Sequence, residues 1–196
     1  MKITKKQLTV TLIVVLAIGL VATGIYAVGK DSDSATISNK STTQQPNNPS
    51  TPSSMPTQST EQQLVYLIEE EKLAHDVYTA MYEKYGANVF GNILKSETTH
   101  QSRVLTLLQA RNIADPRSSE LGVFNNDELQ NLYDALIIQG NKSALEAYKV
   151  GVAVEEKDIA DISNQLATTT EEDVVITLES LRSASENHLR AFNRQL

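Results

Sequence analysis

FGNILKSETTHQSRVLTL, residues 90–107, is an amphipathic segment whose apolar face contains an acid and a base. Apolar residues recur in alternating three- and four-residue steps, the spacing that lines one face of an α-helix. Glu97 and His100 interrupt this stripe in its interior. Its members are Phe90, Ile93, Glu97, His100, Val104 and Leu107. The segment is therefore expected to be a helix that carries a carboxylate and an imidazole into the protein core.

Two later segments repeat the pattern, each with polar residues only in the interior of its stripe. The first stripe is expected to comprise Tyr148, Val152, Glu155, Ile159, Ile162 and Leu166. The second is expected to comprise Val174, Leu178, Leu181, Ser185, His188 and Phe192. Both segments are expected to bury polar groups in the same way as residues 90–107.

An earlier segment offers three acidic candidates in the run EEE at 69–71. Glu69 is expected to point away from the apolar face, whereas Glu70 and Glu71 both border it. Glu71 is favoured because it shares a stripe with other core candidates. These are Leu64, Ile68, Tyr78 and Tyr82.

The pattern from residue 61 onward is helical throughout, without sustained strand alternation. Helices are expected over 61–85, 88–111, 127–139, 144–167 and 171–196. Ser59 or Thr60, Asn125 or Asn126, Ser143 and Thr170 are expected to cap helix starts. Tight turns near Gly86 and 168–170 imply two antiparallel hairpins. The fold class is thus all-α: a four-helix bundle with one long crossover that contains the short helix.

Depth along the bundle places the interrupting side chains at a common level. Each helix rises ~1.5 Å per residue, so the side chains lie roughly 17–27 Å from the turns. They are Glu71, Glu97, His100, Glu155 and His188. One buried, unpaired carboxylate destabilises a protein by several kcal/mol, so three require a positive partner. A pair of divalent metal ions fits these carboxylate and imidazole ligands, and a hydrogen-bonded Glu–His network is the alternative.

Other residues near this layer have simpler interpretations. Arg103 and Arg190 fall beside the stripes, and no lysine lies on them. His75 is expected to be a solvated flank residue. Tyr78 is expected to be a core residue or to donate a hydrogen bond from its hydroxyl to a ligand.

The first 60 residues are expected to lie outside the helical domain of residues 61–196. Residues 8–28 are 21 uncharged, mostly apolar residues, preceded by Lys2, Lys5 and Lys6. Such a segment predicts an N-terminal membrane anchor (1–30) with the rest of the chain exported; a cleaved signal sequence ending near residue 29 would make the protein secreted. Residues 31–60 contain 18 Ser, Thr or Pro residues and are expected to form a disordered linker.

Composition excludes several other classes of function. Beyond residue 30 the chain has 13 Lys and Arg against 24 Asp and Glu, a net charge of −11, so nucleic acid is not an expected partner. The absence of cysteine excludes disulfides, thiolate nucleophiles and Cys-ligated metal centres.

The segments carrying these residues resemble the ferritin-like di-iron carboxylate superfamily, and more closely the uncharacterised family catalogued as domain of unknown function 2202. The resemblance spreads over about 125 residues. The segments are EEEKLAHDVYTAMYEKYG (69–86), SETTH (96–100), GVFNNDELQNLYD (122–134), VEEKDIADI (154–162) and SENHLRAF (185–192).

The resemblance implies a glutamate from one helix of each pair and Glu-x-x-His from the other. Here Glu71, Glu97 with His100, Glu155 and His188 match that pattern. Ser185 departs from it, standing where the pattern has Glu. Asp158, about one turn past Glu155, is favoured as the replacement carboxylate; Glu186 is the alternative. A site with one weak ligand is also compatible with a single metal ion.

The implied function is a reaction of two bound metal ions, with iron favoured, with dioxygen or peroxide, or the oxidation of iron itself. The protein would be exported and tethered to a membrane. Glu97 and Glu155 would bridge the ions. No Cys-x-x-Cys module is present, so a reductant would be external. The alternative is a non-catalytic metal-binding or surface interaction bundle that manganese or zinc stabilises. A metal-free scaffold is the third hypothesis. A homodimer is compatible with each reading.

Overall fold

The computed structural model describes residues 59–196, which form five α-helices and no β-strand. The predicted membrane anchor and almost all of the predicted linker lie outside these residues. The helices are α2 (Thr60–Tyr85), α3 (Asn88–Ala110), α4 (Asp127–Gly140), α5 (Ala144–Leu166) and α6 (Glu172–Asn193). The all-helical prediction is confirmed for this part of the chain.

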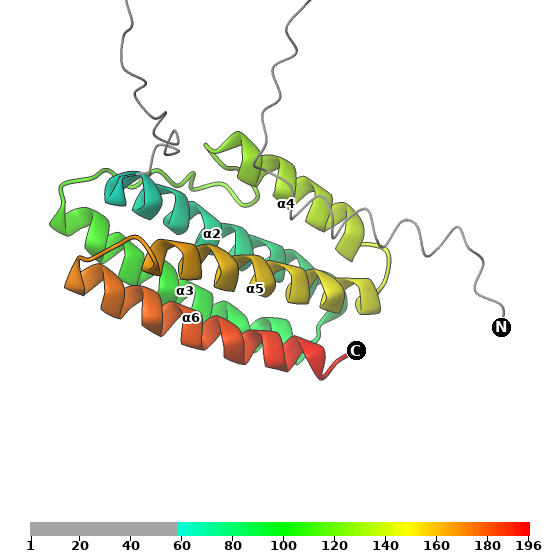
Figure 1. The fold of residues 1–196 in the computed structure, drawn as a ribbon. Helices are drawn as coiled ribbons and strands as arrows, with labels where there is room; N and C mark the ends of the chain where they lie inside the picture. Colours follow the sequence, from blue (N-terminus) through cyan, green and yellow to red (C-terminus); the bar gives the residue numbers. More distant parts are fainter. Residues whose placement is uncertain (1–58) are drawn as a thin grey trace, which may run out of the picture. The chain divides into compact units, whose positions relative to one another are not determined.

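Four long helices form a bundle, and α4 lies outside it (Figure 1). The pairs α2–α3 and α5–α6 are hairpins, α2 also packs on α5, and α3 also packs on α6. The start of α2 and the end of α5 share one apolar cluster through Leu64 and Ile162, so these two helices run antiparallel. The long segment after α3 crosses the bundle to α4, which contacts α2 and α5.

Local sequence signals determine most of the helix ends. Ser59 accepts a hydrogen bond from the Gln62 N–H while the Gln62 side chain accepts one from the Ser59 N–H, a reciprocal cap. Gly86 ends α2 with φ of 63°, a left-handed conformation that glycine adopts without steric penalty. Asn126 and Ser143 cap α4 and α5 with their side chains.

The start of α6 differs from the prediction. Thr170 was expected to cap this helix, but the N-cap residue is Glu171, whose side chain makes no cap hydrogen bond. The Glu171 carboxylate instead accepts a hydrogen bond from Arg111 at 2.6 Å. This ion pair ties the start of α6 to the end of α3.

The apolar core consists of two separate clusters, one toward each end of the bundle. The larger cluster contains aromatic rings, with Tyr78, Phe90 and Phe192 in mutual contact at centroid distances of 5.2–6.0 Å. The other cluster is aliphatic and includes Leu67, Leu108 and Leu178. Buried polar residues of all four long helices lie on the helices between these clusters.

The buried face of α5 is rotated from the predicted stripe. Tyr148, Val152, Ile159 and Leu166 are only partly buried. The fully buried positions are Ala147, Val150, Gly151, Val154, Glu155, Asp158, Ile162 and Gln165. α4 packs on α5 in addition to α2 and α6, so the buried face includes a side that the predicted stripe did not contain. Asp158 therefore faces the protein interior.

The crossover covers a second face of α2. The backbone N–H of Asn125 donates to Glu69, and that of Gly122 donates to Asp76. Lys72 donates to the Glu120 carbonyl oxygen at 3.0 Å. Glu69, expected to point away from the apolar face, is nevertheless buried because of this cover.

Tyr82 marks the edge of the buried face of α2. It was expected in the apolar stripe, but its side chain is 41% exposed. Its ring lies against Gly91 of α3, where a methyl group would come within 2.9 Å of it. The prediction was wrong here because the bundle ends before this turn of the helix is fully enclosed.

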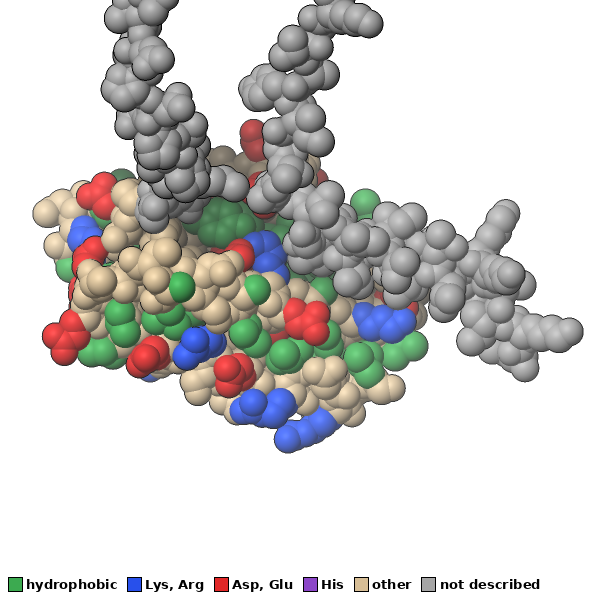
Figure 2. Space-filling model, viewed as in Figure 1, with side chains coloured by type: hydrophobic (Ala, Val, Ile, Leu, Met, Phe, Trp, Pro, Cys, Tyr) green, Lys and Arg blue, Asp and Glu red, His purple; other side chains and the backbone are tan. Residues whose placement is uncertain are grey.

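Acidic, basic and apolar side chains are interspersed over the face shown in Figure 2. Among residues 59–196, no helix combines the length and apolar character that a membrane crossing requires.

Candidate metal centre

Six polar residues predicted as metal ligands are all buried. Their exposed fractions range from 1% to 8%. They are Glu71 on α2, Glu97 and His100 on α3, Glu155 and Asp158 on α5, and His188 on α6. Each of the four long helices therefore contributes at least one of these side chains to the interior.

Glu71, Glu97 and His100 form the first of two compact triads. One ligand atom from each lies within 4.8 Å of the others. His100 Nδ1 is 3.1 Å from Glu71 Oε2 and 3.2 Å from Glu97 Oε2. The three-residue spacing of Glu97 and His100 places both on one face of α3, toward α2.

Glu97, Glu155 and His188 form the second triad, with the same 4.8 Å limit between ligand atoms. His188 Nδ1 is 3.0 Å from Glu97 Oε1 and 3.5 Å from Glu155 Oε1. The two histidine rings are 5.6 Å apart between centroids. Glu97 thus belongs to both triads and presents a different oxygen atom to each histidine.

Several atoms of this layer are buried without a hydrogen-bond partner. They are Glu71 Oε1, Glu97 Oε1, Asp158 Oδ1 and His188 Nδ1. Glu97 Oε1 and His188 Nδ1 lie 3.0 Å apart, but no hydrogen bond joins them. Buried polar atoms normally have partners, so this concentration in one layer fits convergence on cations better than a satisfied hydrogen-bond network.

Asp158 approaches the layer from beside the triads. Ser185 Oγ lies 2.5 Å from Asp158 Oδ2, which leaves Asp158 Oδ1 unpartnered. Asp158 belongs to neither triad. Glu186, the alternative replacement carboxylate, is exposed on α6. Of the two candidates, the interior position is occupied by Asp158.

Burial and mutual repulsion shift the pKa values of these carboxyl groups. Burial raises the pKa of Glu71 to about 8 and that of Asp158 well above its usual range. Burial also acts to raise the pKa of Glu97, but the imidazoles of His100 and His188 that face it outweigh this effect and lower that pKa. Glu97 is therefore the carboxylate most firmly held in its charged form.

The histidines show the complementary effect. Burial acts to lower the pKa of His100, but hydrogen bonds to Glu71 and Glu97 raise it to about 11. Burial also acts to lower the pKa of His188, but the nearby carboxylates of Glu155 and Glu97 outweigh it and raise this pKa to about 9. Two imidazolium ions therefore compensate the buried carboxylates when no metal is bound, and a cation would replace their protons.

Glu70 and Glu71 have different partners, although they are adjacent in the sequence. Lys157 Nζ is 2.7 Å from Glu70 Oε1 and also binds Asp161 and the Tyr66 hydroxyl. Glu71 contacts His100 instead. Glu71 therefore belongs to a triad, whereas Glu70 is paired with Lys157.

Two neighbouring groups orient members of the triads. Tyr78 Oη donates to Glu155 Oε1 at 2.6 Å, as one of its two sequence interpretations expected. Ser96 Oγ lies 3.2 Å from His100 Nε2. Ser96 was missed in the sequence, although its four-residue spacing from His100 was visible there.

His75 is apart from the triads, with its side chain 32% exposed and Nδ1 3.1 Å from Asp76.

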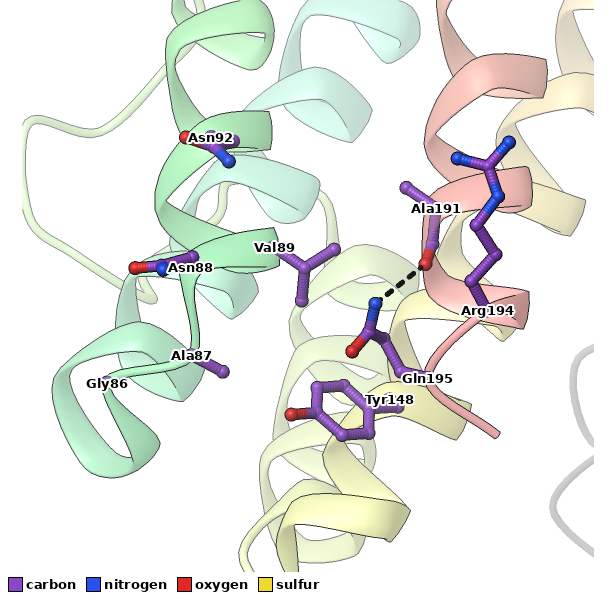
Figure 3. Close-up of a pocket in the computed structure, with 9 residues that line it drawn as sticks. All are labelled: Gly86, Ala87, Asn88, Val89, Asn92, Tyr148, Ala191, Arg194 and Gln195. Atoms are coloured by element: carbon purple, nitrogen blue, oxygen red, sulfur yellow. Dashed lines mark hydrogen bonds between the residues drawn. The ribbon is translucent and has the colours of Figure 1, made fainter.

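A surface pocket of about 570 Å³ lies elsewhere, where α3 begins and α6 ends (Figure 3). It is lined by residues including Asn88, Asn92, Tyr148 and Arg194. The Gln195 side chain is turned to the Ala191 carbonyl oxygen in this pocket. None of the buried carboxylates or histidines lines it, so the pocket and the candidate metal centre are distinct.

The fold and the buried layer define a class: an all-helical bundle with acidic and histidine groups positioned to bind metal. Residues 60–196 match the family described as "Uncharacterized protein domain (DUF2202)". The chain belongs to this family.

One relative, MJ0754, matches both in sequence and in structure. The chain is 43% identical over 134 residues to "Uncharacterized protein MJ0754" of Methanocaldococcus jannaschii, covering 68% of this chain and 72% of the relative. The crystal structure of the hypothetical protein MJ0754, from Methanococcus jannaschii, superimposes with a TM-score of 0.68 at 42% identity. It covers 74% of this chain and 85% of that chain.

Proposed function

We propose that this domain is a ferritin-like carboxylate bundle that binds two divalent metal ions and reacts with dioxygen or peroxide. Iron is the favoured metal. The single observation that carries the proposal is the position of Glu97 in two triads at once. A carboxylate whose two oxygens face two separate sets of ligands is suited to bridge two cations.

Each residue has a distinct part in this arrangement. Glu71 and His100 would hold one ion, and Glu155 and His188 the other, with Glu97 between them. Bound ferrous iron would supply electrons to the oxidant. Tyr78 keeps Glu155 in place through its hydroxyl. The apolar clusters on both sides exclude water from the layer.

Metal content of the full chain tests the proposal. Protein purified from mixed-metal medium should contain about two ions per chain, as a two-metal site requires. Glu97→Gln keeps the size and polarity of the side chain but removes its charge, and should reduce the content at both positions. Glu186→Gln changes an exposed acid on α6 and serves as the control. Equal metal content in wild type and Glu97→Gln would overturn the proposal.

Oxygen consumption distinguishes the reactive iron site from a bundle in which zinc or manganese only stabilises the fold. Zinc has no redox chemistry, so a zinc-loaded protein should not consume oxygen, whereas the ferrous protein should. A metal-free scaffold makes a third prediction: chelators would leave its melting temperature unchanged. Under the proposal chelation lowers it, because the ions bind only the folded state.

We propose further that residues 8–28 anchor the domain to a membrane and that the domain lies outside the cytoplasm. The support is the apolar composition of this segment and the lysines that precede it. An exported site would obtain its ions and reductant from outside the cell. A cleaved signal sequence would place the same domain in the medium instead.

A further inference from the structure

The two histidine segments align without a gap, but only the histidine is the same in both. SETTH (96–100) on α3 and ASENH (184–188) on α6 each end in a buried histidine. Glu97 corresponds to Ser185, and Ser96 corresponds to Ala184. The segment that contains His188 therefore has a hydroxyl where Glu97 has a carboxylate, and a methyl group where Ser96 has a hydroxyl.

Ser96 restricts the orientation of the His100 ring. Its hydroxyl oxygen is 3.2 Å from His100 Nε2, while His100 Nδ1 faces Glu71 and Glu97. When the neutral ring donates its Nε2 hydrogen to Ser96, the lone pair of Nδ1 is directed at the carboxylates. A metal-binding histidine gains affinity from such a partner on its other nitrogen.

His188 has no equivalent support. Its Nδ1 faces Glu97 and Glu155, but no hydrogen bond of its Nε2 to another residue is present within residues 59–196. The residue one turn before it is Ala184, whose methyl group accepts no hydrogen bond. Under the proposed function Asp158 would replace the carboxylate absent from Ser185, and Ser185 donates a hydrogen bond to it.

We infer that Ser96 is a positioning residue and that the two metal positions are consequently unequal. The position at His100 is the tighter one, and the position at His188 exchanges its ion more readily. This inference rests on the proposed two-metal function. It states in addition that the position at His100 binds its ion first and that Ser96 determines the difference in affinity between the two positions.

Titration of the chelator-treated full chain with Co²⁺ tests the inference by calorimetry and visible absorption. Wild type should bind in two steps of different affinity. Ser96→Ala should weaken the tighter step by about 10- to 100-fold, the effect typical of losing such a partner. Ser96→Thr, which keeps the hydroxyl, should restore most of the affinity. Ala184→Ser should strengthen the weaker step and bring the two affinities together.

Ser102→Ala is the matched control. Ser102 is exposed on α3 and its hydroxyl donates to the Thr98 carbonyl oxygen, away from both triads, so Co²⁺ binding should be unchanged. The melting temperature of each variant in chelator separates positioning from folding. A positioning role predicts that Ser96→Ala changes affinity while the metal-free melting temperature stays close to that of Ser102→Ala.

Two outcomes would overturn the inference in distinguishable ways. If wild type binds two Co²⁺ ions and Ser96→Ala matches Ser102→Ala, the inference fails and the proposed function stands. If wild type binds no Co²⁺, both fail together.

Discussion

Glu97 is the residue on which the candidate centre depends. It is 2% exposed, and its neighbours in the layer are carboxylates and imidazoles rather than lysine or arginine. Its pKa is lowered although burial acts in the opposite direction, because two histidines face it. A residue kept charged in the interior is destabilising unless it has a bound partner, which makes it a functional candidate.

Asp158→Asn is predicted to weaken the metal position at His188 by about tenfold or more, as loss of an orienting or ligating carboxylate does. Asn still accepts the hydrogen bond from Ser185, so the metal-free protein should not lose stability. Co²⁺ calorimetry and chemical denaturation measure the two effects. Glu186→Gln should change neither; if it weakens binding and Asp158→Asn does not, Glu186 is the replacement carboxylate.

The residues of the layer were visible in the sequence because they interrupt otherwise apolar stripes. Glu97, His100 and His188 follow directly from that pattern. Asp158 was less evident because the predicted α5 stripe did not contain it. Ser96 is half-buried beside its stripe, so only its distance from His100 reveals it.

At the scale of helices, α2 has an apolar face toward the bundle and a polar face beneath the crossover. Residues 69–74 are all buried, although three of them are glutamates and one is a lysine. Periodicity predicts one buried face per helix and therefore misses a second. The rotation of α5 has the same origin, because α4 covers a side that the sequence alone leaves open.

Asp76→Asn is predicted to loosen the crossover. Burial acts to raise the pKa of Asp76, but hydrogen bonds from His75, Lys72 and the Gly122 N–H lower it below its usual value. A lowered pKa means that the ionised group stabilises the fold above about pH 3.8 and that this contribution is lost as pH falls.

The variant should lose about 1–3 kcal/mol at neutral pH, the range for hydrogen bonds to a charged group. Its stability should also vary less than that of wild type below pH 4. Denaturation between pH 3 and 7 gives the free energy of unfolding, and hydrogen exchange at the Gly122 amide reports the crossover directly. Identical pH profiles for the two proteins would contradict this account.

Gly151→Ala is predicted to destabilise the domain even though alanine favours helices. A methyl group at Gly151 would lie 2.6 Å from the Phe192 ring. Overpacking of this kind destabilises by about 1–3 kcal/mol, which exceeds the ~1 kcal/mol gain in helix propensity.

Denaturant unfolding of Gly151→Ala, Phe192→Leu and the double variant tests the contact as a double-mutant cycle. The smaller leucine should make the alanine less harmful. If the two effects are simply additive, the close approach of α5 and α6 is not what Gly151 provides.

For the whole molecule, residues 8–28 and the −11 charge beyond residue 30 predict an anchored, exported acidic domain. Protease added to intact cells should release residues 61–196 by cleaving within residues 31–60, because a Ser/Thr/Pro-rich composition is typical of segments that proteases cleave. Mass spectrometry of the mature N-terminus distinguishes an anchor from a cleaved signal. Release only after lysis would show that the domain is inside the cell.

The division of the apolar core into two clusters has a dynamic consequence. Each end of the bundle has its own apolar cluster, and the layer between them is held by charged and polar groups. We expect the polar layer of the metal-free protein to open locally while the apolar clusters at both ends stay packed. Metal ions would then enter and leave through this layer without global unfolding of the domain.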